Sequence, residues 1–256
     1  MYREAIEKLK KWKESPKRKP LIVNGARQVG KTWLLKDFGN QYYKRVAYVN
    51  MDNNQRMKDL FTDYNTEKLI QGLKIESGVN IEPQNTLIIL DEVQEVPNAI
   101  TALKYFNENA NEYHIIVAGS LLGIVLHKGV SFPVGKVEFL DMYPLSFKEY
   151  LLALGKENFV KIIENKDEQM LKIFSEEIKR YLREYYYVGG MPEVVNDFSI
   201  NKDYNSVREL QNTILKDYEN DFSKHVSSKE LQKVIEIWNN FNTQLAKEKK
   251  NLYLEH

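Results

Sequence analysis

The sequence predicts an α/β fold: a parallel sheet of about five strands with helices on both faces, followed by an all-helical segment. Three observations support this prediction. Short apolar runs alternate with helix-patterned segments up to residue 145, and a glycine-rich turn follows the first of these runs. From residue 146 onward, apolar residues recur at helical spacing almost throughout.

The first expected element is an amphipathic helix that ends before Ser15-Pro16. Its apolar face consists of Tyr2, Ile6, Leu9 and Trp12. The expected strands cover residues 21–23, 45–51, 86–90, 113–118 and 136–140. Helix-patterned segments between them cover residues 32–38, 67–75 and 98–109. Strands that alternate with helices in this way form a parallel sheet that is covered on both faces.

The pattern changes after Pro144, and Gly189-Gly190 is the main break in the helical part. The expected helices cover residues 147–154, 158–163, 168–187, 192–198, 204–222 and 228–247. We therefore divide the chain into three parts. They are an α/β core with its N-terminal helix (1–145), a helical lid (146–225), and the start of a truncated C-terminal region with tag-like final residues (226–256).

Composition excludes several classes of site. The chain has no cysteine, so disulfides, thiolate metal sites and cysteine nucleophiles are ruled out. The histidines at 114, 127, 225 and 256 form no ligand-spaced cluster, which argues against zinc. The longest apolar stretch, Ile115–Leu126, is shorter than the roughly 20 residues of a membrane-spanning helix. We expect a cytoplasmic protein without a membrane partner.

Charge is unevenly distributed along the chain. The net charge is +1, yet residues 1–20 carry eight basic and three acidic side chains. The basic segment Lys8–Lys19 suggests a DNA or protein partner. A solvated helix face followed by a linker is the commoner explanation of such a run.

The glycine-rich turn fits the pattern G-x-x-x-x-G-K-[ST] in full, between an apolar run and a helical segment. Its residues are Gly25, Ala26, Arg27, Gln28, Val29, Gly30, Lys31 and Thr32. Backbone N–H groups of such a loop bind phosphates at a helix N-terminus. We expect Lys31 to reach the β- and γ-phosphates and the Thr32 hydroxyl to take a Mg²⁺ coordination position. Trp33, which follows directly, is also assigned to the nucleotide site.

Two further strand ends carry polar residues. The run Leu87–Leu90 ends in Asp91 and Glu92, and we expect Asp91 to hold Mg²⁺ and Glu92 to polarise the attacking water. The run His114–Gly119 ends in Ser120, which would sense the γ-phosphate. The carboxyl ends of parallel strands are where an α/β sheet binds its ligands.

With these residues the chain resembles the AAA-type (AAA_14) P-loop ATPases of bacteria and archaea that carry a DUF4143 segment. The matching stretches are Asn24–Thr32, Leu90–Gln94, Ala118–Gly123, Tyr143–Leu151 and Gly189–Val195, within residues 1–225. The resemblance implies an ATPase core with Glu92 as catalytic glutamate and Ser120 in the sensor position. It also implies that Pro192 belongs to a lid motif near the nucleotide.

Two departures from that family are visible. Gly135-Lys136 stands where relatives have Gly-Arg, and lysine lacks the bidentate fork of arginine. Relatives also continue into a nuclease-like C-terminal domain, so we expect an N-terminal fragment whose last residues, Leu254–His256, resemble the start of an affinity tag.

The leading hypothesis is an ATPase that hydrolyses Mg·ATP to drive lid motion. Turnover is expected to be slow unless a partner or a second copy supplies an arginine, because none of Arg27, Arg180 and Arg183 can be assigned as the finger. The alternative is a nucleotide-gated module that binds DNA or a protein and hydrolyses little. A small-molecule kinase would share the loop but lacks an acceptor pattern. GTP is disfavoured, because no Asn-Lys-x-Asp motif is present.

Overall fold

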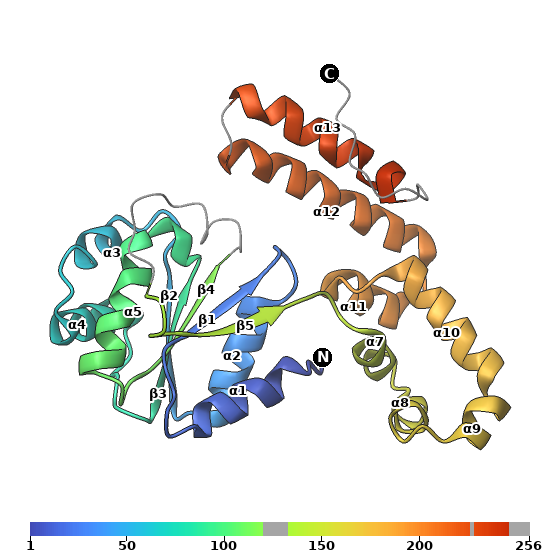
Figure 1. The fold of residues 1–256 in the computed structure, drawn as a ribbon, viewed down its shortest axis with the longest axis horizontal. Coiled ribbons are helices and arrows are strands. Elements are labelled where there is room, and N and C mark those ends of the chain that lie inside the picture. The colour runs from blue at the N-terminus through green and yellow to red at the C-terminus, as the bar shows by residue number, and fades with distance from the viewer. Residues whose placement is uncertain (120–132, 226–227, 246–256) are drawn as a thin grey trace. The chain divides into compact units, whose positions relative to one another are not determined.

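The computed structural model describes residues 1–119, 133–225 and 228–245, and it shows a five-stranded parallel sheet with helices on both faces (Figure 1). The strands are β1 (Leu21–Gly25), β2 (Arg45–Asn50), β3 (Thr86–Asp91), β4 (His114–Gly119) and β5 (Glu138–Met142). Their order is β2-β3-β4-β1-β5, and all four neighbouring pairs are parallel. The predicted fold class is confirmed.

Helices α1 (Ala5–Glu14) and α2 (Lys31–Tyr42) cover one face of the sheet. Helices α3 (Gln55–Leu60), α4 (Thr66–Ser77) and α5 (Pro97–Asn109) cover the other, and the 3₁₀ turn η1 (Val93–Glu95) follows β3. Alternate residues of β3 serve the two faces, since Ile88 and Leu90 point to one layer and Leu87 and Ile89 to the other.

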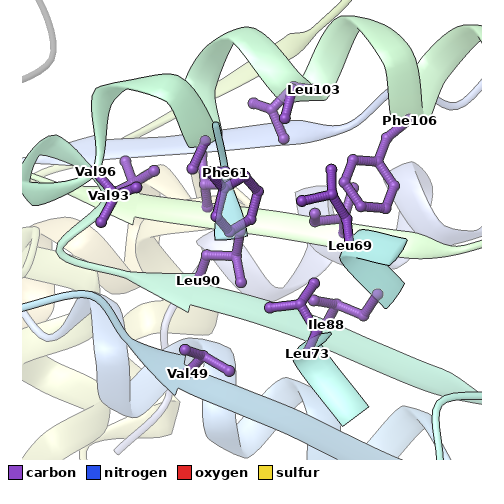
Figure 2. Packing of buried hydrophobic residues seen from close by; sticks show 14 of the residues in the cluster. Val49, Phe61, Leu69, Leu73, Ile88, Leu90, Val93, Val96, Leu103 and Phe106 are labelled. Carbon is purple, nitrogen blue, oxygen red and sulfur yellow. The ribbon is translucent and has the colours of Figure 1, made fainter. Parts of the chain in front are cut away.

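Figure 2 shows how the second layer packs against the sheet. Phe61 lies over Leu90, and Leu73 lies beside Ile88. All four side chains are fully buried, which fixes the register of β3 because a one-residue slip would exchange its two faces. The position of Asp91 at the end of this strand follows from that register.

The helical part runs from α7 to α13. The helices are α7 (Phe147–Ala153), α8 (Glu157–Glu164), α9 (Glu168–Ile173), α10 (Ser175–Val188), α11 (Pro192–Asn201), α12 (Tyr204–His225) and α13 (Ser228–Leu245). Helix α7 starts with a capping box between Ser146 and Glu149. The prediction of a single helix over residues 168–187 is wrong. The chain forms two helices there, α9 and α10, which are separated at Phe174. The Phe174 ring packs edge-on against Phe159. Helix α3 was not expected at all.

The chain divides into two compact units, Met1–Lys202 and Asp203–His256. In the second unit, α12 and α13 pack through aromatic side chains: Trp238 lies against Tyr218 and Phe222. The Trp238 indole N–H also donates to Glu219 at 3.2 Å. The three-part division at residues 145/146 and 225/226 stays a prediction.

Candidate functional site

The loop between β1 and α2 has the backbone of a phosphate-binding turn. Gly30 has φ +89° and Gln28 has φ +63°, so two positions of the loop are left-handed. A side chain at Gly25 would place its Cβ 2.6 Å from the Met142 carbonyl oxygen on β5. Gly30 precedes α2 and brings no side chain to cap it. The amides at the start of α2 therefore suit an anion.

Lys31 lies over its own loop. Its ammonium donates to the carbonyl oxygens of Gly25 (2.9 Å) and Ala26 (2.8 Å). Burial lowers the pKa of Lys31, and the negative charges of Glu92 and Asp91 act in the opposite direction. The lysine is thus a partly desolvated cation between the loop and the carboxylates of β3, where phosphate oxygens would replace the carbonyls as acceptors.

Asp91 forms the centre of a compact group of oxygens. It is 4% exposed, and its Oδ2 accepts hydrogen bonds from the Thr32 hydroxyl (2.6 Å) and the Tyr48 hydroxyl (3.1 Å). Burial, together with the neighbouring Asp91 charge, raises the pKa of Tyr48 to about 12, which keeps this hydroxyl a donor. The two residues assigned to Mg²⁺, Thr32 and Asp91, are therefore in direct contact.

This donor set fits magnesium. Mg²⁺ is usually held by one or two carboxylates together with phosphate oxygens and water, and Thr32 and Asp91 supply two hard oxygens beside the loop. In the part of the chain that the structure describes, no cluster of three or more acidic or histidine side chains could hold a metal alone.

Glu92 follows in a left-handed conformation, with φ 53° and ψ 44°. Its Oε2 accepts a hydrogen bond of 2.5 Å from the Gln94 amide. Gln94 is 4% exposed, and among the described residues no partner is found for its Oε1. The sequence identified Gln94 only as part of a motif, and its contact with Glu92 appears only in three dimensions.

The remaining assigned residues have different outcomes. Ser120 lies outside the described residues, directly after Gly119, which pairs with Asn24 of β1. Pro192 begins α11, and its Cγ lies 3.6 Å from where a Cβ of Gly30 would stand. Pro192 thus lies against the glycine-rich loop between β1 and α2.

Trp33 is 49% exposed and lines a groove of about 420 Å³ between α1 and α2, together with Tyr2 and Tyr42. The groove borders the start of α2, next to Thr32. Charged side chains, among them Glu7, Lys10 and Asp37, line the same groove, so its surface is of mixed polarity.

Two cations that the sequence left open have structural partners. Lys136 forms an ion pair with Glu108 at 2.9 Å. The Arg180 guanidinium lies over the Tyr181 ring, 4.8 Å from its centroid. A buried arginine that the sequence did not single out, Arg3, donates to the Val29 carbonyl of the loop at 2.7 Å. No local pattern near residue 3 signals this contact.

Comparison with known proteins gives two family matches. A model described as an AAA domain (AAA_14) matches residues 17–151, more than half of the chain. A model described as a domain of unknown function (DUF8612) matches residues 179–253. The expected DUF4143 segment is not what this region matches.

An uncharacterized protein of Methanocaldococcus jannaschii is 27% identical over an alignment of 235 residues. The match covers 82% of this chain and 45% of that protein. The chain thus spans about half the length of this curated relative.

Three solved structures show a general likeness. Drosophila ORC bound to DNA has a TM-score of 0.44 at 14% identity and covers 97% of this chain and 69% of its own. AMPPCP-bound DnaA from Aquifex aeolicus has a TM-score of 0.44 at 16% identity, and the match covers 88% of this chain and 69% of that chain. The Thermotoga maritima RuvB Holliday junction branch migration motor has a TM-score of 0.45 at 13% identity, and the match covers 93% of this chain and 70% of that chain. Across the described segments, no helix is long and apolar enough to cross a membrane.

Proposed function

Since the chain belongs to the AAA domain family, we propose that it binds Mg·ATP at the loop between β1 and α2 and hydrolyses it to move the helical lid. The observation that carries this proposal is the hydrogen bond between Thr32 and Asp91, at 2.6 Å. It joins the end of the phosphate loop to the end of β3, beside the Lys31 ammonium. A carboxylate, a hydroxyl and a lysine at one loop are the parts that phosphoryl transfer needs.

In this proposal, Thr32 and Asp91 hold Mg²⁺, which neutralises charge on the phosphates when bound. The loop residues 25–32 donate backbone N–H groups to the phosphates. Lys31 exchanges the Gly25 and Ala26 carbonyls for phosphate oxygens. We assign the exposed Trp33, which directly follows the loop, to the nucleotide site.

Glu92 is proposed as the group that orients and deprotonates the attacking water, with Ser120 sensing the γ-phosphate. The Gln94 amide holds one carboxylate oxygen of Glu92, so the other is available to the water. Pro192 lies against Gly30 and is proposed to support the loop in its phosphate-binding conformation. We further propose that turnover in isolation is slow and that a second copy or partner supplies the arginine.

Two variants test the proposal. Lys31→Ala should lose Mg·ATP binding, and Glu92→Gln should retain binding but release no phosphate. Lys68→Ala is the control, because Lys68 forms only an exposed ion pair with Asp63. Isothermal titration and phosphate release measure the two properties. Equal hydrolysis by the wild type and Glu92→Gln would refute the role of Glu92, and tight Mg·ATP binding by Lys31→Ala would refute the site.

The alternative is a nucleotide-gated module that binds DNA or a protein, in the cytoplasm, through the basic segment Lys8–Lys19. Two basic residues of this segment make hydrogen bonds within the protein. The Lys13 ammonium donates to the Tyr42 carbonyl at 2.5 Å, and Arg18 donates to the Asn111 carbonyl at 2.6 Å. Lys8, Lys11 and Lys17 are exposed.

A salt titration of DNA binding with the triple Lys→Ala variant at residues 8, 11 and 17 tests this alternative. The alternative is supported if DNA affinity falls with salt concentration and if the variant shows a shallower slope of log affinity against log salt concentration. If the wild type does not bind DNA at low salt, DNA is excluded as the partner.

A further inference from the structure

A buried arginine from the N-terminal segment reaches the phosphate loop. Arg3 is 6% exposed and precedes α1. Its Nη1 donates to the Val29 carbonyl at 2.7 Å, and its Nη2 donates to the Tyr143 carbonyl at 2.6 Å. Its Nε donates to Glu149 Oε1 at 3.1 Å. One guanidinium thus joins the loop, the connection after β5, and helix α7.

Glu149 is buried and accepts several hydrogen bonds, as its partner Arg3 donates several. Its side chain is also 6% exposed. Oε1 accepts a second hydrogen bond from the Glu4 amide at 2.7 Å, and Oε2 accepts one from the Ser146 amide at 2.9 Å. Both charges of the ion pair are therefore hydrogen-bonded in several directions, which fixes the orientation of the Arg3 fork.

The contact with Val29 bears on the amide that follows it. In a trans peptide the C=O and the next N–H point in opposite directions. Because Arg3 holds the Val29 oxygen on its own side, the Gly30 N–H is directed to the opposite side of the loop. Gly30, with φ +89°, lies at a position where the backbone rotates easily, so an external restraint matters most there.

We infer that Arg3 is a positioning residue for phosphate binding, and that Glu149 of α7 holds it in place. Arg3 acts through the Val29–Gly30 peptide and touches neither the phosphates nor the metal. The inference rests on the proposed function, because the Gly30 amide is one of the N–H groups assigned to the phosphates. It also makes nucleotide affinity depend on α7, the first helix of the predicted lid.

The test compares the full chain with Arg3→Lys, Glu149→Gln and the double variant, titrated with Mg·ATP in a calorimeter. Lysine keeps the charge, but its compact ammonium lacks the planar fork with which Arg3 spans acceptors on the loop, on the connection after β5 and on α7. We expect Arg3→Lys to weaken Mg·ATP binding about tenfold, which corresponds to one charge-assisted hydrogen bond. Glu149→Gln should weaken it in the same direction, and the double variant should lose less than the product of the two effects.

The control is Tyr150→Phe. It removes a partly buried hydrogen bond of 2.7 Å between Tyr150, on the same helix as Glu149, and Glu184, and it leaves the hydrogen bonds of Arg3 in place. Its dissociation constant should equal that of the wild type even where its melting temperature falls.

A purely structural role for Arg3 predicts something else: fewer binding-competent molecules, lower kcat at saturating ATP, and an unchanged dissociation constant. That result overturns the inference, as does a dissociation constant in Arg3→Lys equal to that of the wild type. A raised dissociation constant with unchanged kcat at saturation supports it. Absence of Mg·ATP binding by the wild type overturns the proposed function and this inference together, whereas wild-type binding with unaffected variants overturns the inference alone.

Discussion

Replacing Gly190 by alanine should push the lid motif away from the phosphate loop. A Cβ at this position would stand 2.4 Å from the Leu145 carbonyl oxygen and 2.9 Å from the Leu145 nitrogen. Both neighbours are backbone atoms, and the Leu145 oxygen is also held by the Tyr185 hydroxyl at 2.6 Å. The strand exit at Leu145 therefore cannot yield cheaply, and the segment before α11 must move instead.

The cost can be worked out from these contacts. Ordinary heavy-atom contacts are about 3.5 Å, so the two backbones must separate by about 1 Å. Overpacking of this kind costs about 1–3 kcal/mol. The same movement breaks the hydrogen bond from the Leu145 amide to the Gly190 oxygen, 2.6 Å long, which adds about 1 kcal/mol. The unfolding free energy should fall by about 2–4 kcal/mol.

Urea unfolding, followed by circular dichroism, measures this loss. The matched control is Gly155→Ala, because Gly155 has φ +68° and open space around its Cβ position. That control carries only the conformational penalty of about 1 kcal/mol. Calorimetry should show weaker Mg·ATP binding in Gly190→Ala alone, since Pro192 follows two residues later and lies against Gly30.

A loss of stability in Gly190→Ala no larger than in Gly155→Ala would refute the steric reasoning. A large loss of stability with unchanged Mg·ATP affinity would leave the packing correct but refute the link between Pro192 and the loop.

Two further predictions concern the sheet and the metal site. Burial lowers the pKa of His114 to about 4, and its Nδ1 lies 2.6 Å from the Tyr43 hydroxyl. The unfolded chain therefore binds more protons between about pH 4 and 6.5, so up to about 3 kcal/mol of stability, present above this range, is lost as pH falls through it. Urea midpoints at pH 7.5 and 4.5 should differ less in His114→Gln than in the wild type, and equal differences would contradict the assignment. Thr32→Val should abolish the Mg²⁺-dependent gain in ATP affinity that Thr32→Ser keeps, because valine has no hydroxyl oxygen to bind the metal beside Asp91. Titrations with and without EDTA measure this gain, and its persistence in Thr32→Val would contradict the metal site.

Local sequence patterns were sufficient for the core of this protein. The apolar runs before Gly25 and Asp91 are buried strands in the structure, and the glycine-rich turn begins α2. A few consecutive residues are enough to indicate these features, because a short apolar run is typical of a buried strand and a glycine-rich turn commonly precedes a helix. The contact between Thr32 and Asp91 then follows from parallel strands that end at one edge of a sheet.

Tertiary structure decided what surrounds that core. Arg3 and Glu149 are 146 residues apart, and nothing in the periodicity of either segment predicts that they pair. The interruption at Phe174, whose ring packs against Phe159, is likewise seen only in the folded chain, because the local helical pattern continues through it. Periodicity shows which residues are buried, but only the folded chain determines which buried polar groups meet. The sequence alone determined the glycine-rich turn and the strand that ends at Asp91. The tertiary structure supplied the buried ion pair between Arg3 and Glu149, because charged groups taken out of water must find partners wherever the fold places them.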